Sequence, residues 1–127
     1  MILVDTSVWV DHLRVGNARL RGLLLEEVVH CHPFVIGEVA CGSLGSRSEV
    51  IGLMSGLPMA AVVDNEGVLR LIESRRLYGR GIGWSDAHLL AAALASGLPL
   101  WTNDKRLRSL AADLKVADPR SCQLTGP

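Results

Sequence analysis

The 127-residue chain has few cysteines, no long apolar run and no excess of charge of either sign. Its three cysteines, Cys31, Cys41 and Cys122, are an odd number at spacings unlike those of metal sites. This pattern excludes a secreted scaffold held by disulfides and favours free thiols in a reducing cytoplasm.

Extended apolar segments are also missing. The first apolar run covers only residues 2–4, and no stretch approaches the roughly 18 uninterrupted apolar residues of a membrane-spanning helix. Neither a basic leader nor a cleavage motif accompanies the first run. We therefore expect a cytoplasmic protein that does not bind membranes.

Charge imbalance and repetition are absent as well. Thirteen basic residues balance thirteen acidic ones, and a net charge of zero by itself argues against a nucleic-acid partner. The chain contains no internal repeat and no low-complexity segment. A repeat array or a strongly charged tail is thereby excluded.

What the chain does contain is alternating strand-like and helix-like segments, with 49% hydrophobic residues. Short apolar runs predict buried parallel strands at 2–5, 28–32, 59–63 and 98–102, with a candidate fifth at 114–117. Helices are expected between them, and a glycine-rich loop at 79–83. We predict a single α/β domain over residues 1–127, with a parallel sheet of four or five strands flanked by helices, and a flexible tail at 118–127.

Four carboxylates stand at junctions between these segments. Asp5 and Asp104 follow apolar strands, whereas Glu38 and Asp86 lie near the starts of apolar helical stretches. Ionised groups beside aliphatic runs are rarely buried unless they are paired or bind metal. Because ligands of parallel sheets bind beyond the carboxyl ends of the strands, we expect an acidic pocket at that edge.

Converging carboxylates raise one another's pKa, so such a pocket favours divalent cations. Oxygen ligands suit Mg²⁺ or Mn²⁺, and one or two such ions could activate a water and bind a scissile phosphate. The pattern indicates metal-assisted hydrolysis of a phosphodiester. If Asp5, Glu38, Asp86 and Asp104 hold cations, nine acidic residues remain against thirteen basic ones, eleven of them arginines that suit phosphate contacts.

The four motifs resemble those of PIN domains, and more narrowly the VapC-type toxins of toxin–antitoxin pairs. The matching segments are Asp5-Thr6-Ser7, the helix with Glu38, the helix from Ser85-Asp86, and Leu100-Trp101-Thr102-Asn103-Asp104. Their order and their spacings of 33, 48 and 18 residues carry the resemblance, which spans residues 2 to about 112.

This resemblance implies a PIN-like three-layer sandwich and an endoribonuclease that depends on Mg²⁺ or Mn²⁺. It also implies a homodimer inhibited by a small cognate antitoxin. Asp5, Glu38, Asp86 and Asp104 would form the acidic site, with Thr6 or Ser7 and Thr102 supplying hydroxyls and Asn103 adjoining them. The RNA would be contacted by side chains near the motifs, for which the candidates are Arg80, Trp84, Lys105 and Arg106.

Each carboxylate also has a structural alternative. Asp5 and Asp104 could be helix N-caps, with Asn103 competing for the second position, and Glu38 could pair with an internal arginine. Asp86 could simply be a first-turn charge favoured by the helix dipole. Trp84 could pack in the core or at a dimer interface instead of stacking on a base.

Other protein classes fit less well. A haloacid-dehalogenase-like phosphatase needs an aspartate where Ser7 stands, and a response-regulator receiver needs a mid-chain phosphoacceptor that Asp64 does not match. A zinc site at His30-Cys31-His32 lacks a fourth ligand. The remaining alternatives are a PIN nuclease of RNA processing that is not a toxin, or a non-catalytic module that binds RNA or protein.

Overall fold

A computed structural model describes residues 1–120, which form three parallel strands enclosed by helices. The strands are β1 (Ile2–Val4), β2 (Val29–His30) and β3 (Leu100–Trp101), in the order β2-β1-β3. Leu3 pairs with His30 on one side and with Leu100 on the other. All three β1 residues are buried, because helices cover both faces of the central strand.

The predicted α/β class and parallel sheet are confirmed, but four or five strands was wrong for residues 1–120. The expected strands at 59–63 and 114–117 are reduced to single bridges, Cys31 with Met59 and Leu100 with Ala117. The first ladder ends because the Ala61 amide donates to Ser96 Oγ rather than to a strand. The second stops near Pro119, which has no amide hydrogen to donate.

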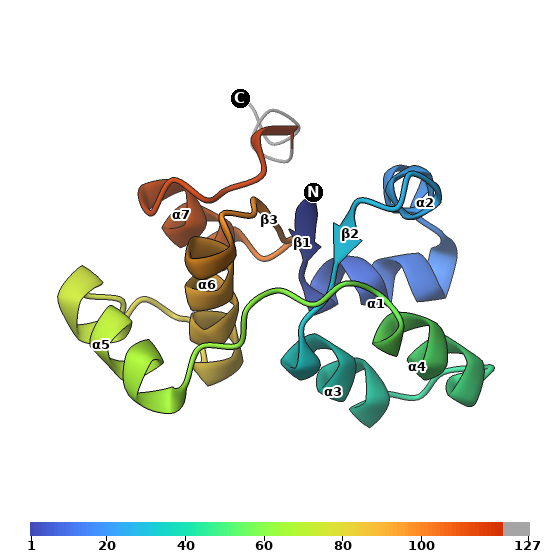
Figure 1. Ribbon diagram of the computed structural model, residues 1–127, viewed down its shortest axis with the longest axis horizontal. Helices are drawn as coiled ribbons and strands as arrows, with labels where there is room; N and C mark the ends of the chain where they lie inside the picture. The colour runs from blue at the N-terminus through green and yellow to red at the C-terminus, as the bar shows by residue number, and fades with distance from the viewer. Residues whose placement is uncertain (121–127) are drawn as a thin grey trace.

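The first half of the chain places four helices on one side of the strands (Figure 1). They are α1 (Thr6–Val15), α2 (Ala18–Leu25), α3 (Pro33–Cys41) and α4 (Arg47–Ser55). Side chains define two of their starts: Asn17 accepts from the Leu20 amide, and His32 accepts from the Phe34 amide. Side-chain caps therefore set where these two helices begin.

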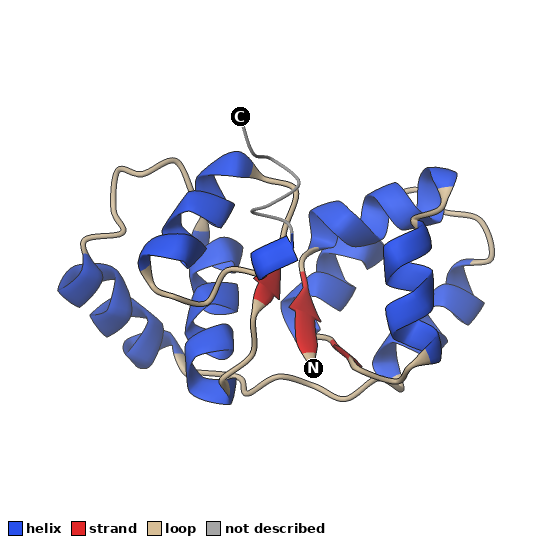
Figure 2. Cartoon of the chain, turned by 90° about the horizontal axis from the view of Figure 1, so that it is seen from above, coloured by secondary structure: helices blue, strands red, loops and turns tan. Residues whose placement is uncertain are grey.

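The second half places α5 (Asn65–Arg75), α6 (Trp84–Ser96) and α7 (Lys105–Asp113) on the other side. Figure 2 shows the strands at the centre, between these two groups of helices. Helix α6 is buried continuously from Ala87 to Ala93 and ends at Gly97, whose φ of 64° is left-handed. This buried helix brings Asp86, in its first turn, to the sheet.

The end of the described chain is tied to the fold. Asp118 is only 3% exposed, and its carboxylate forms two hydrogen bonds with the Arg19 guanidinium, of 2.5 and 3.0 Å. The tail predicted from 118 therefore does not include Asp118, and its part at 121–127 lies outside the described residues. None of the helices in residues 1–120 is long and apolar enough to cross a membrane.

Candidate active site

Asp5 ends β1, and its carboxylate is held by two hydroxyl groups. Ser7 Oγ donates to Asp5 Oδ2 at 2.8 Å, and Thr102 Oγ1 donates to the same oxygen at 2.7 Å. Although Asp5 occupies the N-cap position of α1, its side chain makes no capping hydrogen bond. The cap alternative is therefore wrong for Asp5, a buried residue (6% exposed) whose Oδ1 receives no hydrogen bond from residues 1–120.

The direction of both hydroxyl protons is determined by backbone amides just after β3. The Asn103 amide donates to Ser7 Oγ at 3.0 Å, and the Asp104 amide donates to Thr102 Oγ1 at 3.1 Å. Since an amide only donates, each hydroxyl accepts on the backbone side and turns its own proton toward Asp5. The network therefore holds the Asp5 carboxylate in one orientation.

Asp104 lies at the start of α7 and uses one oxygen as a cap. Its Oδ1 accepts from the Leu107 amide at 3.0 Å, so the predicted capping role is real for this residue. The side chain is exposed, and Asn103 does not take the cap. Asp104 Oδ2 has no hydrogen bond within residues 1–120 and stays available to a ligand.

Asp86 occupies the third position of α6, where its Oδ2 accepts from the Gly83 amide at 3.2 Å. Burial raises the pKa of this carboxyl above its ordinary value, the Gly83 hydrogen bond lowers it, and the charges of Asp5, Asp104 and Glu38 raise it further. Asp86 thus responds electrostatically to all three of the other carboxylates. The four carboxylates therefore lie close enough for their charges to affect Asp86, as one acidic site would require.

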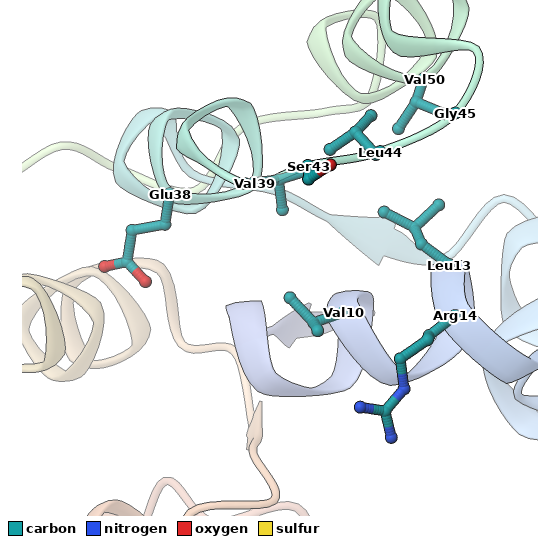
Figure 3. A pocket seen from close by; sticks show the side chains of 10 residues that line it. Val10, Leu13, Arg14, Glu38, Val39, Ser43, Leu44, Gly45 and Val50 are labelled. Atoms are coloured by element: carbon teal, nitrogen blue, oxygen red, sulfur yellow. The ribbon is translucent and has the colours of Figure 1, made fainter.

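Glu38 is exposed on α3 and forms no salt bridge with a residue in 1–120. Its predicted alternative, an internal pair with an arginine, is therefore wrong. The side chain borders a hollow of about 550 Å³ between α1, α3 and α4. Figure 3 shows Val10 and Leu13 facing this hollow from α1, with Glu38 and Arg14 at its two ends.

The donor set fits a hard divalent cation in its chemistry. All four acidic groups offer oxygen, Asp5 keeps one carboxylate oxygen free, and the clustered negative charge has no cationic side chain paired with it in residues 1–120. As the side chains stand, however, no group of three or more Asp, Glu, His or Cys in these residues is gathered tightly enough to hold an ion.

The other predicted site residues divide into two groups. Ser7, Thr102 and the Asn103 amide belong to the Asp5 network, whereas Thr6 Oγ1 is buried without a hydrogen-bond partner in residues 1–120. On the cationic side, Arg80 forms an exposed 3.3 Å ion pair with Asp113. Arg106 lies against Gly81, Lys105 is exposed, and Trp84 is 41% exposed.

Comparison with known families decides what this arrangement is. The model of the PIN domain matches residues 2–113, which is most of the chain. The chain belongs to the PIN domain family. It is also 51% identical over 118 residues to a protein named ribonuclease VapC32 from two strains of Mycobacterium tuberculosis, covering 92% of this chain and 95% of that relative. The predicted resemblance to VapC-type PIN proteins is confirmed.

Two parts of this PIN domain were missed by the sequence analysis. The Gly83 amide, which binds Asp86, carries no side-chain signal and is recognisable only as the position before a helix. Tyr78, which is 59% exposed, lines a small hollow together with Trp84. Its position directly before the glycine-rich loop was the available signal.

Proposed function

We propose that this PIN domain is a metal-dependent endoribonuclease that hydrolyses RNA phosphodiester bonds as the toxin of a toxin–antitoxin pair. The observation that carries the proposal is the Asp5 carboxylate, oriented by Ser7 and Thr102 beside three further acidic groups. A relative that is 51% identical and named a ribonuclease supports the RNA-cleaving activity.

We assign Asp5, Glu38, Asp86 and Asp104 to the binding of one or two Mg²⁺ or Mn²⁺ ions. Such an ion would supply activation of a water and stabilisation of charge on a scissile phosphate. The protein's own contribution is orientation. Ser7 and Thr102 hold Asp5 Oδ2, which leaves Oδ1 free to bind a ligand, and the Gly83 amide holds Asp86 Oδ2.

The RNA backbone would be bound by cations that are not already paired. Lys105 and Arg106 are exposed at the start of α7, directly after the site residue Asp104. Arg80 is engaged by Asp113, so we give it a lesser role than these two. An exposed ion pair is weak, at about 0–1 kcal/mol, and RNA phosphates would compete with Asp113 for Arg80.

The partners implied by the family remain part of the proposal. A small antitoxin would need an accessible surface near the site, and the hollow bordered by Glu38, Val10 and Leu13 offers one (Figure 3). Homodimerisation and a cytoplasmic location are proposed with it. A PIN nuclease of RNA processing is the alternative, and it differs in the consequence of expression rather than in the site.

The test compares the wild-type protein with the Asp5→Asn variant on single-stranded and structured RNA. We expect the wild type to cleave RNA with Mg²⁺ or Mn²⁺ and to be inactive in EDTA. The cleavage rate of the variant should be lower by at least about 100-fold. Circular dichroism and thermal unfolding should show the variant folded. Cleavage that persists in EDTA, or an Asp5→Asn variant at wild-type rate, would contradict the metal mechanism.

Expression in cells separates the toxin from the RNA-processing alternative. Wild-type expression should arrest growth, whereas Asp5→Asn expressed to the same level should not. A protein that cleaves RNA in vitro but leaves growth unaffected would favour the processing nuclease.

A further inference from the structure

The two exposed aromatic side chains among residues 1–120 line the same hollow. The chain has three tryptophans, one tyrosine and one phenylalanine. Trp9 and Trp101 are 4% and 5% exposed and Phe34 is partly buried, whereas Tyr78 and Trp84 are 59% and 41% exposed. Large aromatic surface facing solvent in a protein with so few aromatics indicates a binding role.

The hollow is small and mostly apolar. It measures about 150 Å³ and lies between α5, the loop at 79–83 and the start of α6. Besides Tyr78 and Trp84 it is lined by Ile72, Leu77, Gly79, Ile82, Gly83 and Ala87. Ligand sites for drug-sized molecules are larger, at about 300–1,000 Å³, so this one suits a single flat ring.

The hollow adjoins the acidic site through shared residues. Gly83 lines the hollow, and its amide is the group that holds Asp86 Oδ2 at 3.2 Å. Ala87, also in the lining, follows Asp86 directly on α6. A ring bound here would therefore belong to a nucleotide very close to the phosphate at the carboxylates.

A cationic side chain lies against the same loop but outside the lining of the hollow. A Cβ at Gly81, whose φ is +84°, would come within 2.6 Å of Arg106 Cδ and 2.8 Å of Arg106 Nη1. Gly81 thus leaves room for the Arg106 side chain, which forms no ion pair in residues 1–120. The loop offers an aromatic hollow and a guanidinium together, which matches a base and its phosphate.

We propose that Tyr78, Trp84 and the loop at 79–83 form a pocket for one unpaired nucleobase beside the scissile phosphate. The inference rests on the proposed ribonuclease activity and adds a base-binding subsite to it. Stacking on aromatic faces would supply the affinity, and backbone groups of the loop would contact the edge of the base. The Arg80–Asp113 pair ties this loop to the end of α7.

The decisive experiment couples a change in the RNA to a change in the protein. The probe is a single-stranded RNA that the wild type cuts at one bond, together with a series in which one residue near that bond is abasic. At one position, base removal should lower the wild-type kcat/KM by about 5- to 150-fold, the range expected for base–aromatic stacking.

The Tyr78→Ala/Trp84→Ala double variant should lose activity on the intact RNA and respond to that abasic position by less than about 2-fold. Trp84→Phe keeps an aromatic face and should retain most of the wild-type response. Leu69→Ala, on α5 and 54% exposed but outside the hollow, is the matched control and should behave as the wild type.

A positioning effect of Trp84 on Asp86 would give a different result. Trp84 packs edge-on against His88, with ring centroids 4.6 Å apart, so a purely structural role would shift α6 when the ring is removed. In that case the substitution would lower kcat/KM by the same factor on intact RNA and on each abasic RNA. Base removal would then still lower kcat/KM in the variant as much as in the wild type. That outcome would overturn the pocket.

Tryptophan fluorescence gives an independent reading that needs no cleavage. In an Asp5→Asn background, RNA should quench the emission of exposed Trp84, and Trp84→Phe should abolish the response because Trp9 and Trp101 are buried. If Trp84 emission changes with protein concentration in the absence of RNA, the hollow is an interface between two copies of the chain. That result would overturn the inference. If the wild type cuts no RNA, the proposed function is rejected. If the wild type cuts RNA but base removal and the aromatic substitutions act independently, only the base pocket is rejected.

Discussion

At the scale of single residues, the site depends on how the Asp5 carboxylate is oriented. Its Oδ2 receives both hydroxyl protons, and each hydroxyl is in turn directed by a backbone amide. Groups that orient metal-binding carboxylates are typically worth 10- to 100-fold in metal affinity or activity. The two hydroxyl groups would therefore matter through the orientation that they give Asp5.

We predict that Ser7→Ala and Thr102→Val each lower cleavage about 10- to 100-fold and weaken Mg²⁺ activation. Valine preserves the packing of Thr102, which is fully buried. Because both hydroxyls serve one oxygen, the double variant should lose less than the product of the single losses. The measurement is kcat/KM against Mg²⁺ concentration, with Ser74→Ala, an exposed hydroxyl on α5, as the control. Unchanged activity in both single variants would contradict the role of the network.

The raised pKa of Asp86 has a consequence for stability. Burial and the charges of Asp5, Asp104 and Glu38 favour the protonated acid in the folded state. Stability contributed by this group is therefore present at low pH and lost as pH rises through its folded pKa. At neutral pH without metal, the ionised Asp86 destabilises the fold.

We predict that Asp86→Asn raises the melting temperature in EDTA, and that its advantage grows as pH rises from about 4 through the raised folded pKa of Asp86 and is then constant. The side-chain amide oxygen of the introduced asparagine can still accept from the Gly83 amide, so the start of α6 is retained. Mg²⁺ should stabilise the wild type more than the variant and so reduce the difference between their melting temperatures. A variant less stable than the wild type across this pH range would contradict the electrostatic argument.

At the scale of elements, the starts of helices decide where Asp5, Asp86 and Asp104 lie. Helix α6 carries Asp86 in its first turn and stops at Gly97, which has a left-handed φ of 64°. A side chain in that conformation is strained, whereas glycine adopts it freely. The stop allows the chain to turn into β3, whose end presents Thr102 and Asp104.

We predict that Gly97→Ala destabilises the protein by about 1 kcal/mol through backbone strain alone, since a Cβ there would meet nothing within 4 Å. Gly52→Ala is the matched control. Gly52 lies in the interior of α4, exposed and with open space around its Cβ position, so alanine should stabilise by about 0.5–1 kcal/mol. Urea unfolding measures the change in the free energy of unfolding for both variants. Equal changes would contradict the role of the left-handed backbone at Gly97.

At the scale of the whole molecule, two ion pairs join distant segments with very different environments. Arg19 of α2 binds Asp118 through side chains that are 16% and 4% exposed, and its guanidinium lies 4.4 Å from the Trp101 ring centroid. Arg80 and Asp113 are 44% and 62% exposed. Breaking a buried pair is costly, whereas exposed pairs contribute little.

We predict that Asp118→Asn lowers the free energy of unfolding by about 3 kcal/mol or more. Asp113→Asn, which breaks the exposed pair, should change it by no more than about 1 kcal/mol. Urea unfolding at low and high salt provides the measurement, and the Asp118 effect should be the less sensitive to salt. Equal losses in the two variants would show that residue 118 does not anchor the chain end.

Local features of the fold were predictable because they depend on neighbours in the chain. The starts of α2 and α7 follow from Asn17 and Asp104, and the end of α6 follows from Gly97. The apolar run at 2–4 predicted the central strand correctly. The width of the sheet was not predictable in this way, because a side-chain acceptor, Ser96, takes the amide that a longer strand at 59–63 would need.

The sequence by itself determined the family and the α/β class, and it predicted the four acidic residues of the candidate site, since order, spacing and periodicity are properties of the chain. Only the tertiary structure decided what each residue does. Thr102 meets Asp5 across 97 positions because β1 and β3 are neighbours in a parallel sheet. The Asp5 carboxylate is therefore held by hydroxyl groups, whereas the Asp104 carboxylate caps a helix. The hollow beside Tyr78 and Trp84 likewise needs packing, because Ile72 of α5 and Ala87 of α6 complete its lining.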